Sequence, residues 1–382
     1  MSTIYYGVAG EGRGHAARAR AITECLRQRH RVVIYANAHS LEMLAPQYKE
    51  DEDVEVRALP PLEFQYGADA RLDYLKTCVS SLIYLANMPG LIREVMRAAE
   101  VDAPDLIITD FEPVLVRVAR KMGIPFISLD HQHFLNTTDF SDLPWTLQAY
   151  ASFMSPFVRA LVSGQTHTIV SSFFRPPLKP GLTDVTRIGV MLRDSILEAA
   201  PEDRGHVVAY LRRDSSASAL PGLARCGRRV RVYGLAERAP IGALSFHPID
   251  PVRFVEDLAT STALVCTAGN QLVGEALYLG KPVLGVPERG NFEQHINAHY
   301  LAKSGSGEAV TLESLDAVSI KAFLARREQY RAAIDRRFLD GTPAAVRVIE
   351  TVLSSCGALS TSLNQKRITS RIQADSAVSA SL

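Results

Sequence analysis

The stretch ALVCTAGNQLVGEALYLGKPVLGVPERGNFEQHINAHY, residues 263–300, decides the fold. It opens with a short apolar run of strand character at 263–266 and passes through small polar residues into a helical segment at 271–278. A second apolar strand, at 282–286, is followed by a polar loop and another helix. This alternation predicts parallel strands joined by crossover helices, an α/β fold.

Both polar loops of this stretch should lie at the carboxyl ends of parallel strands, where open α/β sheets bind ligands. In the first loop, free backbone N–H groups and the positive end of the helix dipole suit a diphosphate. Glu275, one turn into the helix, can accept hydrogen bonds from vicinal ribose hydroxyls, and Gln294 can bond the hydroxyls of an attached sugar. The contacts to a nucleotide sugar that this stretch predicts are Thr267, Gly269, Asn270, Glu275 and Gln294.

The order of short motifs in residues 267–298 resembles the donor-binding half of inverting GT-B glycosyltransferases. These motifs are small-Ala-Gly, Glu-Ala-Leu, Gly-Lys-Pro-Val-Leu, Pro, Glu-Gln and Asn-Ala. The sequence is most similar to the branch that holds the lipid-linked N-acetylglucosaminyltransferase of peptidoglycan synthesis and teichoic-acid-type enzymes. The resemblance implies two Rossmann-like, doubly wound parallel-sheet domains that face each other across a cleft. It also implies that Glu275 holds the ribose, the Gly269–Asn270 turn meets the diphosphate, and the Glu293–Gln294 pair meets the sugar.

Composition agrees with a large α/β enzyme. A chain of 382 residues is expected to form two domains, because single cores stop growing below this length. Hydrophobic residues make up 47% of the chain, which suits buried parallel strands. With 42 basic and 41 acidic residues the formal charge is +1, so no overall basic field points to nucleic acid.

Cysteine usage and the amino terminus favour a cytoplasmic location. The five cysteines are scattered and lack paired spacing, which fits reduced thiols and predicts neither a disulfide framework nor a zinc site. The chain begins MSTIYYGVAG and enters a strand directly, and it has no apolar run long enough to span a bilayer. We therefore expect a cytoplasmic protein, compatible with peripheral contact at the inner face of the membrane.

The strand–helix pattern divides the chain into two halves. Strands are expected at 4–9, 31–36, 54–58, 106–109 and 125–129 in the first half, and at 206–211, 229–234 and 244–247 in the second. The Pro- and Gly-rich segment 172–184 interrupts the pattern, and RIGVMLR at 187–193 resembles the family's crossover. We therefore expect an acceptor-binding domain over 1–186, a crossover over 187–194 and a donor domain over 195–330. Helices over 331–356 should return to the first domain, and the Ser/Ala-rich tail 357–382 is expected to be disordered.

A glycine-rich loop over residues 7–15, GVAGEGRGH, joins the first strand to the first helix. It is not a dinucleotide fingerprint, because the G-x-G-x-x-G spacing and the acidic residue after the second strand are both missing. No Walker lysine follows either. The loop is similar to the Gly-His turn that opens the acceptor domain in the glycosyltransferase branch. That likeness implies acceptor contacts at Gly12 and Gly14 and places His15 at the cleft.

His15 and Asp110 are the predicted catalytic residues. A histidine at the first strand–helix turn can remove a proton from an acceptor hydroxyl if a carboxylate fixes its tautomer and supports its charge. Asp110 ends an apolar strand in IITDFEP and should reach the same cleft rim, and several similar enzymes pair such an aspartate with the loop histidine. The alternatives are a helix N-cap role for His15 and a strand-end turn role for Asp110.

Three other groups of polar residues are weaker candidates for a metal site or for substrate contacts. His131 and His133 have a metal-like spacing, but no third ligand accompanies them, so we expect contacts to the acceptor instead. The DxD at 51–53 lies in a charge run before a strand, which is usually a solvated turn, and no metal site is predicted. Arg193 is expected at the diphosphate; Arg212 and Arg213 could assist it, although at least one of the three should be a surface residue.

An aromatic helix is expected at residues 143–162, LPWTLQAYASFMSPFVRALV. Leu147, Tyr150, Met154, Phe157 and Leu161 form an apolar stripe at helical spacing, which in globular proteins usually packs on the sheet. The alternative is contact with a membrane that carries a lipid-linked acceptor, although only Arg159 supplies positive charge.

These residues and the resemblance together predict an inverting, metal-independent glycosyltransferase of the hexosyltransferase type that needs no cofactor. The donor would be a UDP-sugar, and the acceptor hydroxyl would belong to a glycan, a lipid-linked carrier of the cell envelope or a small molecule. Two alternatives stay open: a UDP-sugar epimerase or hydrolase of the same fold, and a noncatalytic protein that binds nucleotide sugars.

Overall fold

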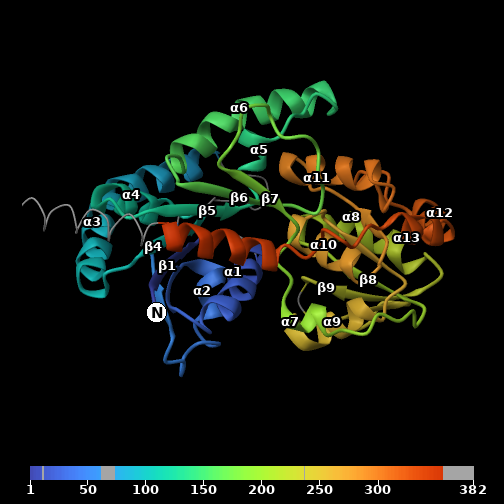
Figure 1. Cartoon of the computed structure of the whole chain (residues 1–382). Helices are drawn as coiled ribbons and strands as arrows, with labels where there is room; N and C mark the ends of the chain where they lie inside the picture. Colours follow the sequence, from blue (N-terminus) through green and yellow to red (C-terminus); the bar gives the residue numbers. More distant parts are fainter. Residues whose placement is uncertain (11–12, 62–73, 236, 356–382) are drawn as a thin grey trace, which may run out of the picture.

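Two parallel-sheet α/β domains make up the protein (Figure 1). The computed structural model describes residues 1–10, 13–61, 74–235 and 237–355. Within these ranges the first sheet has seven strands and the second has six, and every strand pair is parallel. The predicted architecture of two doubly wound parallel-sheet domains is confirmed.

The first sheet has the strand order β3-β2-β1-β4-β5-β6-β7. Its central strands are apolar and buried on both faces, as expected when helices cover both sides of a parallel sheet. The strands are β1 Thr3–Val8, β2 Arg31–Ala36, β3 Val54–Ala58, β4 Leu106–Asp110, β5 Phe126–Asp130, β6 His167–Ser171 and β7 Val185–Ile188. The helices are α1 Arg13–Leu26, α2 Ala38–Leu44, α3 Tyr74–Asp102, α4 Pro113–Met122, α5 Phe134–Thr137 and α6 Trp145–Leu161.

The second sheet has the order β10-β9-β8-β11-β12-β13, which repeats the winding of the first. Its strands are β8 His206–Tyr210, β9 Arg229–Tyr233, β10 Leu244–Phe246, β11 Ala263–Cys266, β12 Val283–Gly285 and β13 Gly307–Ala309. The helices from the crossover onward are α7 Asp194–Leu197, α8 Arg213–Ala224, α9 Pro251–Ala259, α10 Asn270–Tyr278, α11 Phe292–Lys303, α12 Ala317–Ala325 and α13 Arg327–Ala333.

The last strand of the first sheet differs from the sequence pattern. β7 reaches Ile188, so the first two residues of the segment that we assigned to the crossover, Arg187 and Ile188, pair with β6 instead. The apolar residues of this strand are few and a Pro- and Gly-rich segment precedes it, which is why periodicity alone did not mark it.

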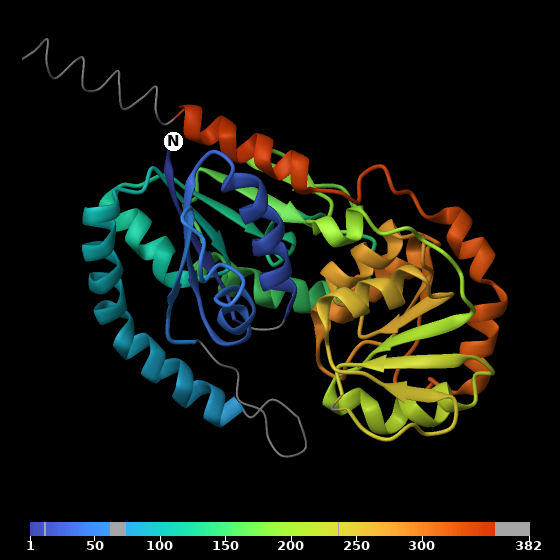
Figure 2. The same cartoon turned by 90° about the horizontal axis from the view of Figure 1, so that it is seen from below.

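A helix over residues 342–355 follows the second domain and lies along the first one (Figure 2). Its apolar side chains Ala345, Ile349, Val352 and Leu353 are buried in the same cluster as Ile4 of β1 and Ile22 of α1. This helix ties the end of the described chain to the first sheet. The segment 357–382 lies outside the described residues.

The two domains share a continuous apolar interface. Phe134, Phe173 and Phe174 of the first domain belong to the same buried cluster as Tyr300 and Leu301 of α11. The rings of Phe174 and Tyr300 stack with centroids 4.5 Å apart. Because the strands of each sheet are parallel, the loops at their carboxyl ends meet at this interface, and the candidate site forms there.

Candidate functional site

His15 and Asp110 meet in the interior of the first domain. His15 lies in the first turn of α1 and Asp110 is the last residue of β4, next to β1 in the sheet. His15 Nδ1 lies 2.9 Å from Asp110 Oδ1. His15 is 9% exposed and Asp110 is fully buried. With Nδ1–H directed at the carboxylate, the other ring nitrogen, Nε2, is left to accept a proton.

Arg18 is a third member of this group, and sequence reasoning missed it. Its Nε and Nη2 atoms each donate to one Asp110 oxygen over 2.8 Å, and Nη2 lies 3.1 Å from His15 Nδ1. Burial alone would lower the pKa of Arg18, but the Asp110 carboxylate raises it above its ordinary value. Arg18 could have been identified from the sequence, because it lies three residues after His15 on the predicted helix and residues three apart share a helix face.

Two loops of the site contain residues with left-handed backbone conformations. Phe111, directly after Asp110, has φ of +59°, and Ala268, in the loop before α10, has φ of +61°. Such values are costly for residues with a side chain, and strain of this kind concentrates at functional sites.

The amino terminus of α10 is open. Gly269 is its N-cap, no side chain caps the helix, and a Cβ built on Gly269 would have no heavy atom within 4 Å. Thr267, before it, is buried. Gly14 of the first domain lies against α10, since a Cβ on Gly14 would be 3.7 Å from Gln271 Cβ. Gly14 and His15 therefore lie beside the amino-terminal part of α10.

Glu275 is buried in the second turn of α10 and paired with Arg193. Arg193 Nη2 lies 2.9 Å from Glu275 Oε2, and Arg193 Nε donates to Oε1 over 3.2 Å. Gln271 donates to the same Oε1 atom over 3.0 Å and to the Met191 carbonyl over 2.6 Å. The structure thus brings together Glu275 and Arg193, which the sequence placed on ribose and diphosphate respectively.

Gln271 is the second residue that sequence reasoning missed. Its Oε1 atom is buried and accepts no hydrogen bond within the described part of the chain. A buried acceptor without a partner is costly and invites a donor, such as a hydroxyl group. Gln271 could have been identified from the sequence, because it lies in the first turn of the predicted helix, next to the polar loop.

Asn270 connects the two domains. Its Oδ1 atom accepts from the Phe173 backbone N–H over 3.1 Å, and its Nδ2 donates to the Ser171 carbonyl over 3.2 Å. The side chain therefore fixes the first domain against α10, and only the backbone N–H groups of this turn are left to face a phosphate.

Gln294 and Glu293 begin α11 after the second loop. Gln294 is buried; its Oε1 accepts from the Glu288 backbone N–H over 2.8 Å, and its Nε2 donates to the Glu288 carboxylate over 3.1 Å. The side chain of Glu293 is 38% exposed, and its Oε1 atom lies 4.0 Å from His131 Nε2. Arg212 also approaches Glu288, with 3.6 Å between Nη1 and Oε2.

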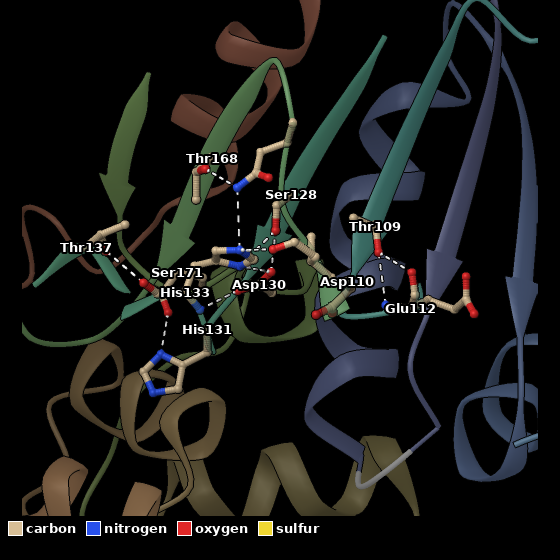
Figure 3. A network of polar contacts seen from close by, with 12 residues as sticks. Thr109, Asp110, Glu112, Ser128, Asp130, His131, His133, Thr137, Thr168 and Ser171 are labelled. Carbon is tan, nitrogen blue, oxygen red and sulfur yellow. Dashed lines mark hydrogen bonds and ion pairs between the residues drawn. The ribbon is translucent and has the colours of Figure 1, made fainter. Parts of the chain in front are cut away.

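His131 and His133 follow β5 but point in different directions (Figure 3). His131 reaches the domain interface, with Nδ1 2.8 Å from the Ser171 carbonyl and Nε2 3.1 Å from Asn297 Oδ1. His133 turns back into the first domain, where Nδ1 lies 2.7 Å from Asp130 Oδ2. Both residues are 2% exposed, and the acceptor contacts expected of them stay a prediction.

These histidines have different electrostatic surroundings. Burial lowers the pKa of His131. Burial would also lower the pKa of His133, but the Asp130 carboxylate raises it above its ordinary value. The same contact holds the pKa of Asp130 at about 2 although burial opposes this. His133 and Asp130 thus form a buried ion pair that fixes the loop after β5.

Gly12 lies outside the described residues, and so does the side chain of Arg213. Within the described ranges, no group of three or more histidine, cysteine, aspartate or glutamate side chains is arranged to hold a metal ion. None of the described helices is long and apolar enough to cross a membrane.

A pocket of about 730 Å³ lies between β3 and α3, away from these residues. Its polar lining includes Arg57 and Asp102, whose Nη1 and Oδ2 atoms are bonded to each other over 2.7 Å. These two charged groups of the lining are therefore already paired with each other.

The helix α6 carries large apolar side chains on two faces. Leu147, Tyr150 and Met154 of the predicted stripe pack against the interdomain cluster. Phe157 of the same stripe is 52% exposed, and Trp145 and Phe153 are 78% and 66% exposed.

Comparisons with known proteins agree with this architecture. A spinosyn forosaminyltransferase has a TM-score of 0.62 at 15% identity, over 93% of this chain and 99% of that one. The calicheamicin glycosyltransferase CalG4 has a TM-score of 0.63 at 17% identity, over 93% and 99% of the two chains. Arabidopsis thaliana UGT89C1, solved with UDP, has a TM-score of 0.65 at 14% identity, over 93% and 100%. The TM-scores show that these proteins share the fold of this chain.

No curated protein matches the sequence. The family model described as "Glycosyl transferase family 1" matches residues 2–327, which include His15, Asp110 and all of the stretch 263–300. The chain therefore belongs to glycosyl transferase family 1.

Proposed function

We propose that the protein transfers a sugar from a UDP-sugar to an acceptor hydroxyl, with inversion at the anomeric carbon. The observation that carries the proposal is the His15–Asp110 contact beside α10. A carboxylate that fixes Nδ1–H leaves Nε2 free to take the acceptor proton, while the hydroxyl oxygen attacks C1 from the face opposite the diphosphate. The bond from C1 to the diphosphate oxygen breaks as the new glycosidic bond forms, and UDP departs.

The amino terminus of α10 would stabilise the departing diphosphate. Gly269 is uncapped and open, so the first backbone N–H groups of the helix and its positive dipole end can meet negative charge. Preorganised donors of this kind stabilise charge that develops in a transition state. This arrangement supports a metal-independent reaction with no cofactor.

Glu275, Gln271 and Arg193 would form the remaining donor contacts. The ribose hydroxyls can donate to Glu275 and to the unpartnered Gln271 Oε1 atom, and they would replace part of the Arg193 contact. Arg193 would then turn its guanidinium toward the diphosphate. Glu293 and Gln294, beyond the next strand, would bind the sugar. UGT89C1 was also solved with UDP-L-rhamnose, which supports a UDP-sugar as the donor class.

A lipid-linked acceptor of the cell envelope is the finer part of the proposal. Trp145, Phe153 and Phe157 form an exposed aromatic face on α6, in the acceptor half of the molecule. Aromatic side chains are favoured at membrane interfaces, and this face would allow peripheral contact of a cytoplasmic enzyme with the membrane. UGT89C1 was solved with quercetin, so a small soluble acceptor is the competing candidate.

The experiment is a panel of UDP-sugars and acceptors in which the release of UDP is measured with and without each acceptor. The proposal expects release that depends on the acceptor. Turnover of a UDP-sugar without an acceptor would point instead to an epimerase or hydrolase. Tight UDP binding without turnover under any condition would point to a noncatalytic protein that binds nucleotide sugars.

A further inference from the structure

The buried pair His15–Asp110 does not stand alone, because Arg18 occupies both oxygens of the carboxylate. Its Nε donates to Oδ2 and its Nη2 donates to Oδ1, both over 2.8 Å, in the two-pronged geometry that suits guanidinium and carboxylate. Arg18 is 3% exposed and Asp110 is fully buried. The charge of Asp110 is therefore already balanced before His15 gains a proton.

Arg18 also lies directly beside the imidazole. Its Nη2 atom is 3.1 Å from His15 Nδ1. A guanidinium nitrogen can only donate, so while Nδ1–H is directed at Asp110 this approach is a close contact between two donors and not a hydrogen bond. If Nδ1 keeps its proton to donate to Asp110, a second proton on Nε2 would place an imidazolium next to a permanent cation. Two like charges at this distance in a buried place disfavour the charged ring.

The other titratable groups around the trio do not cancel this effect. Tyr6 of β1 is neutral, because burial and then Asp110 raise the pKa of its hydroxyl well above the ordinary value. Asp130 of β5 is bound to Ser128 and His133. On α10, Glu275 is paired with Arg193, and at the domain interface burial lowers the pKa of His131.

We propose that Arg18 is a positioning residue: it orients the Asp110 carboxylate against His15 Nδ1 and, through its permanent charge beside the ring, opposes the addition of a second proton to His15. The inference rests on the proposed function only in giving His15 the role of base. The electrostatic part concerns the free protein and needs neither donor nor acceptor.

The test is the titration of His15 by NMR in full-length protein labelled at the histidine ring carbons, with the His15 signal assigned by its loss in His15→Gln. In Arg18→Gln the cation is removed and Asp110 is uncompensated, so the pKa of His15 should be higher than in the native protein by about one pH unit or more. Arg18→Lys keeps the charge and should titrate close to the native protein. The control is Arg20→Gln, which makes the same change about 200° around the same helix and should leave the titration unchanged.

A pKa of His15 that is unchanged or lower in Arg18→Gln would overturn the inference. So would an Arg18→Lys variant whose His15 titrates as high as that of Arg18→Gln. If Arg18→Gln does not fold, the lysine variant decides alone: a His15 pKa higher than native by one pH unit would contradict the charge effect, and a native value would support it.

Kinetics give a second readout that separates this inference from the proposed function. If the enzyme transfers sugar, the acid limb of the pH profile of kcat/KM should move to higher pH in Arg18→Gln, by the same amount as the NMR titration. An equal loss of rate at every pH would mark Arg18 as merely structural and contradict the inference. If no acceptor supports transfer, the proposed function fails while the titration still decides the role of Arg18.

Discussion

Arg193 of the crossover and Glu275 of α10 form an ion pair, with 2.9 Å between Nη2 and Oε2. Glu275 also accepts from Gln271, so the carboxylate has protein partners on both oxygens. A nucleotide that binds Glu275 through its ribose must compete with these partners. The pair therefore orients the carboxylate, and we propose that a bound nucleotide would release Arg193 toward its diphosphate.

The first prediction concerns UDP affinity. Glu275→Ala should weaken UDP binding by about 1 to 3 kcal/mol, because hydrogen bonds to a charged group are lost. Calorimetric titration measures this. The matched control is Glu256→Ala on α9, whose side chain is 67% exposed and which should leave the affinity unchanged. An unaltered affinity in a folded Glu275→Ala protein would remove Glu275 from the site.

Metal independence is the second prediction. Because backbone N–H groups at the open end of α10 would stabilise the diphosphate, sugar transfer should survive an excess of EDTA. The measurement is the rate of acceptor-dependent UDP release before and after chelation. Complete loss of rate that magnesium or manganese restores would contradict the role given to the helix.

The contact between the two catalytic candidates, His15 and Asp110, could be predicted from the sequence. His15 and Asp110 could be paired because each follows a strand of clear apolar pattern, and the sheet order brings those strands side by side. The strand–helix alternation of the donor motif predicted β11, α10 and β12 for the same reason.

What the sequence did not predict depends on contacts between distant segments. Asn270 is of a residue type that faces phosphates at helix starts, yet its side chain binds Ser171 and Phe173 across the interface. His131 and His133 follow one strand closely, but a short turn sends their rings to different domains. Periodicity describes a residue's own element and carries no information on such partners.

The third prediction concerns the membrane. If the exposed aromatic face of α6 contacts lipid, the native protein should sediment with anionic liposomes at low salt, and a variant with Trp145→Ala and Phe153→Ala should do so less. The control is Val101→Ala, which removes an exposed apolar side chain from α3 instead. A native protein that stays in the supernatant and glycosylates a soluble acceptor efficiently would reject the lipid-linked acceptor.

A fourth prediction follows from the buried pair His133–Asp130. Asp130 raises the pKa of His133 in the folded state, so the stabilisation by this histidine is complete below its unfolded pKa of about 6.5 and is lost as the pH rises through the folded value. The pKa of Asp130 is lowered to about 2, so its contribution is complete above its unfolded value and is lost only in acid.

His133→Asn should therefore show a smaller fall in thermal stability than the native protein between about pH 6 and pH 9. Thermal unfolding at several pH values measures the difference. His39→Asn is the control, because that side chain is 64% exposed. Parallel pH profiles of the native and His133→Asn proteins would show that the buried pair does not carry the charge assigned to it.

The central claim is that His15 is the base of a sugar transfer whose donor lies on the other domain. Its most direct test compares the native protein and His15→Gln in two assays, the rate of acceptor-dependent UDP release and the calorimetric affinity for UDP. The account predicts that His15→Gln lowers the rate by about two orders of magnitude or more and leaves the affinity for UDP nearly unchanged. A variant that keeps the native rate, or that loses UDP binding and rate together, would contradict it.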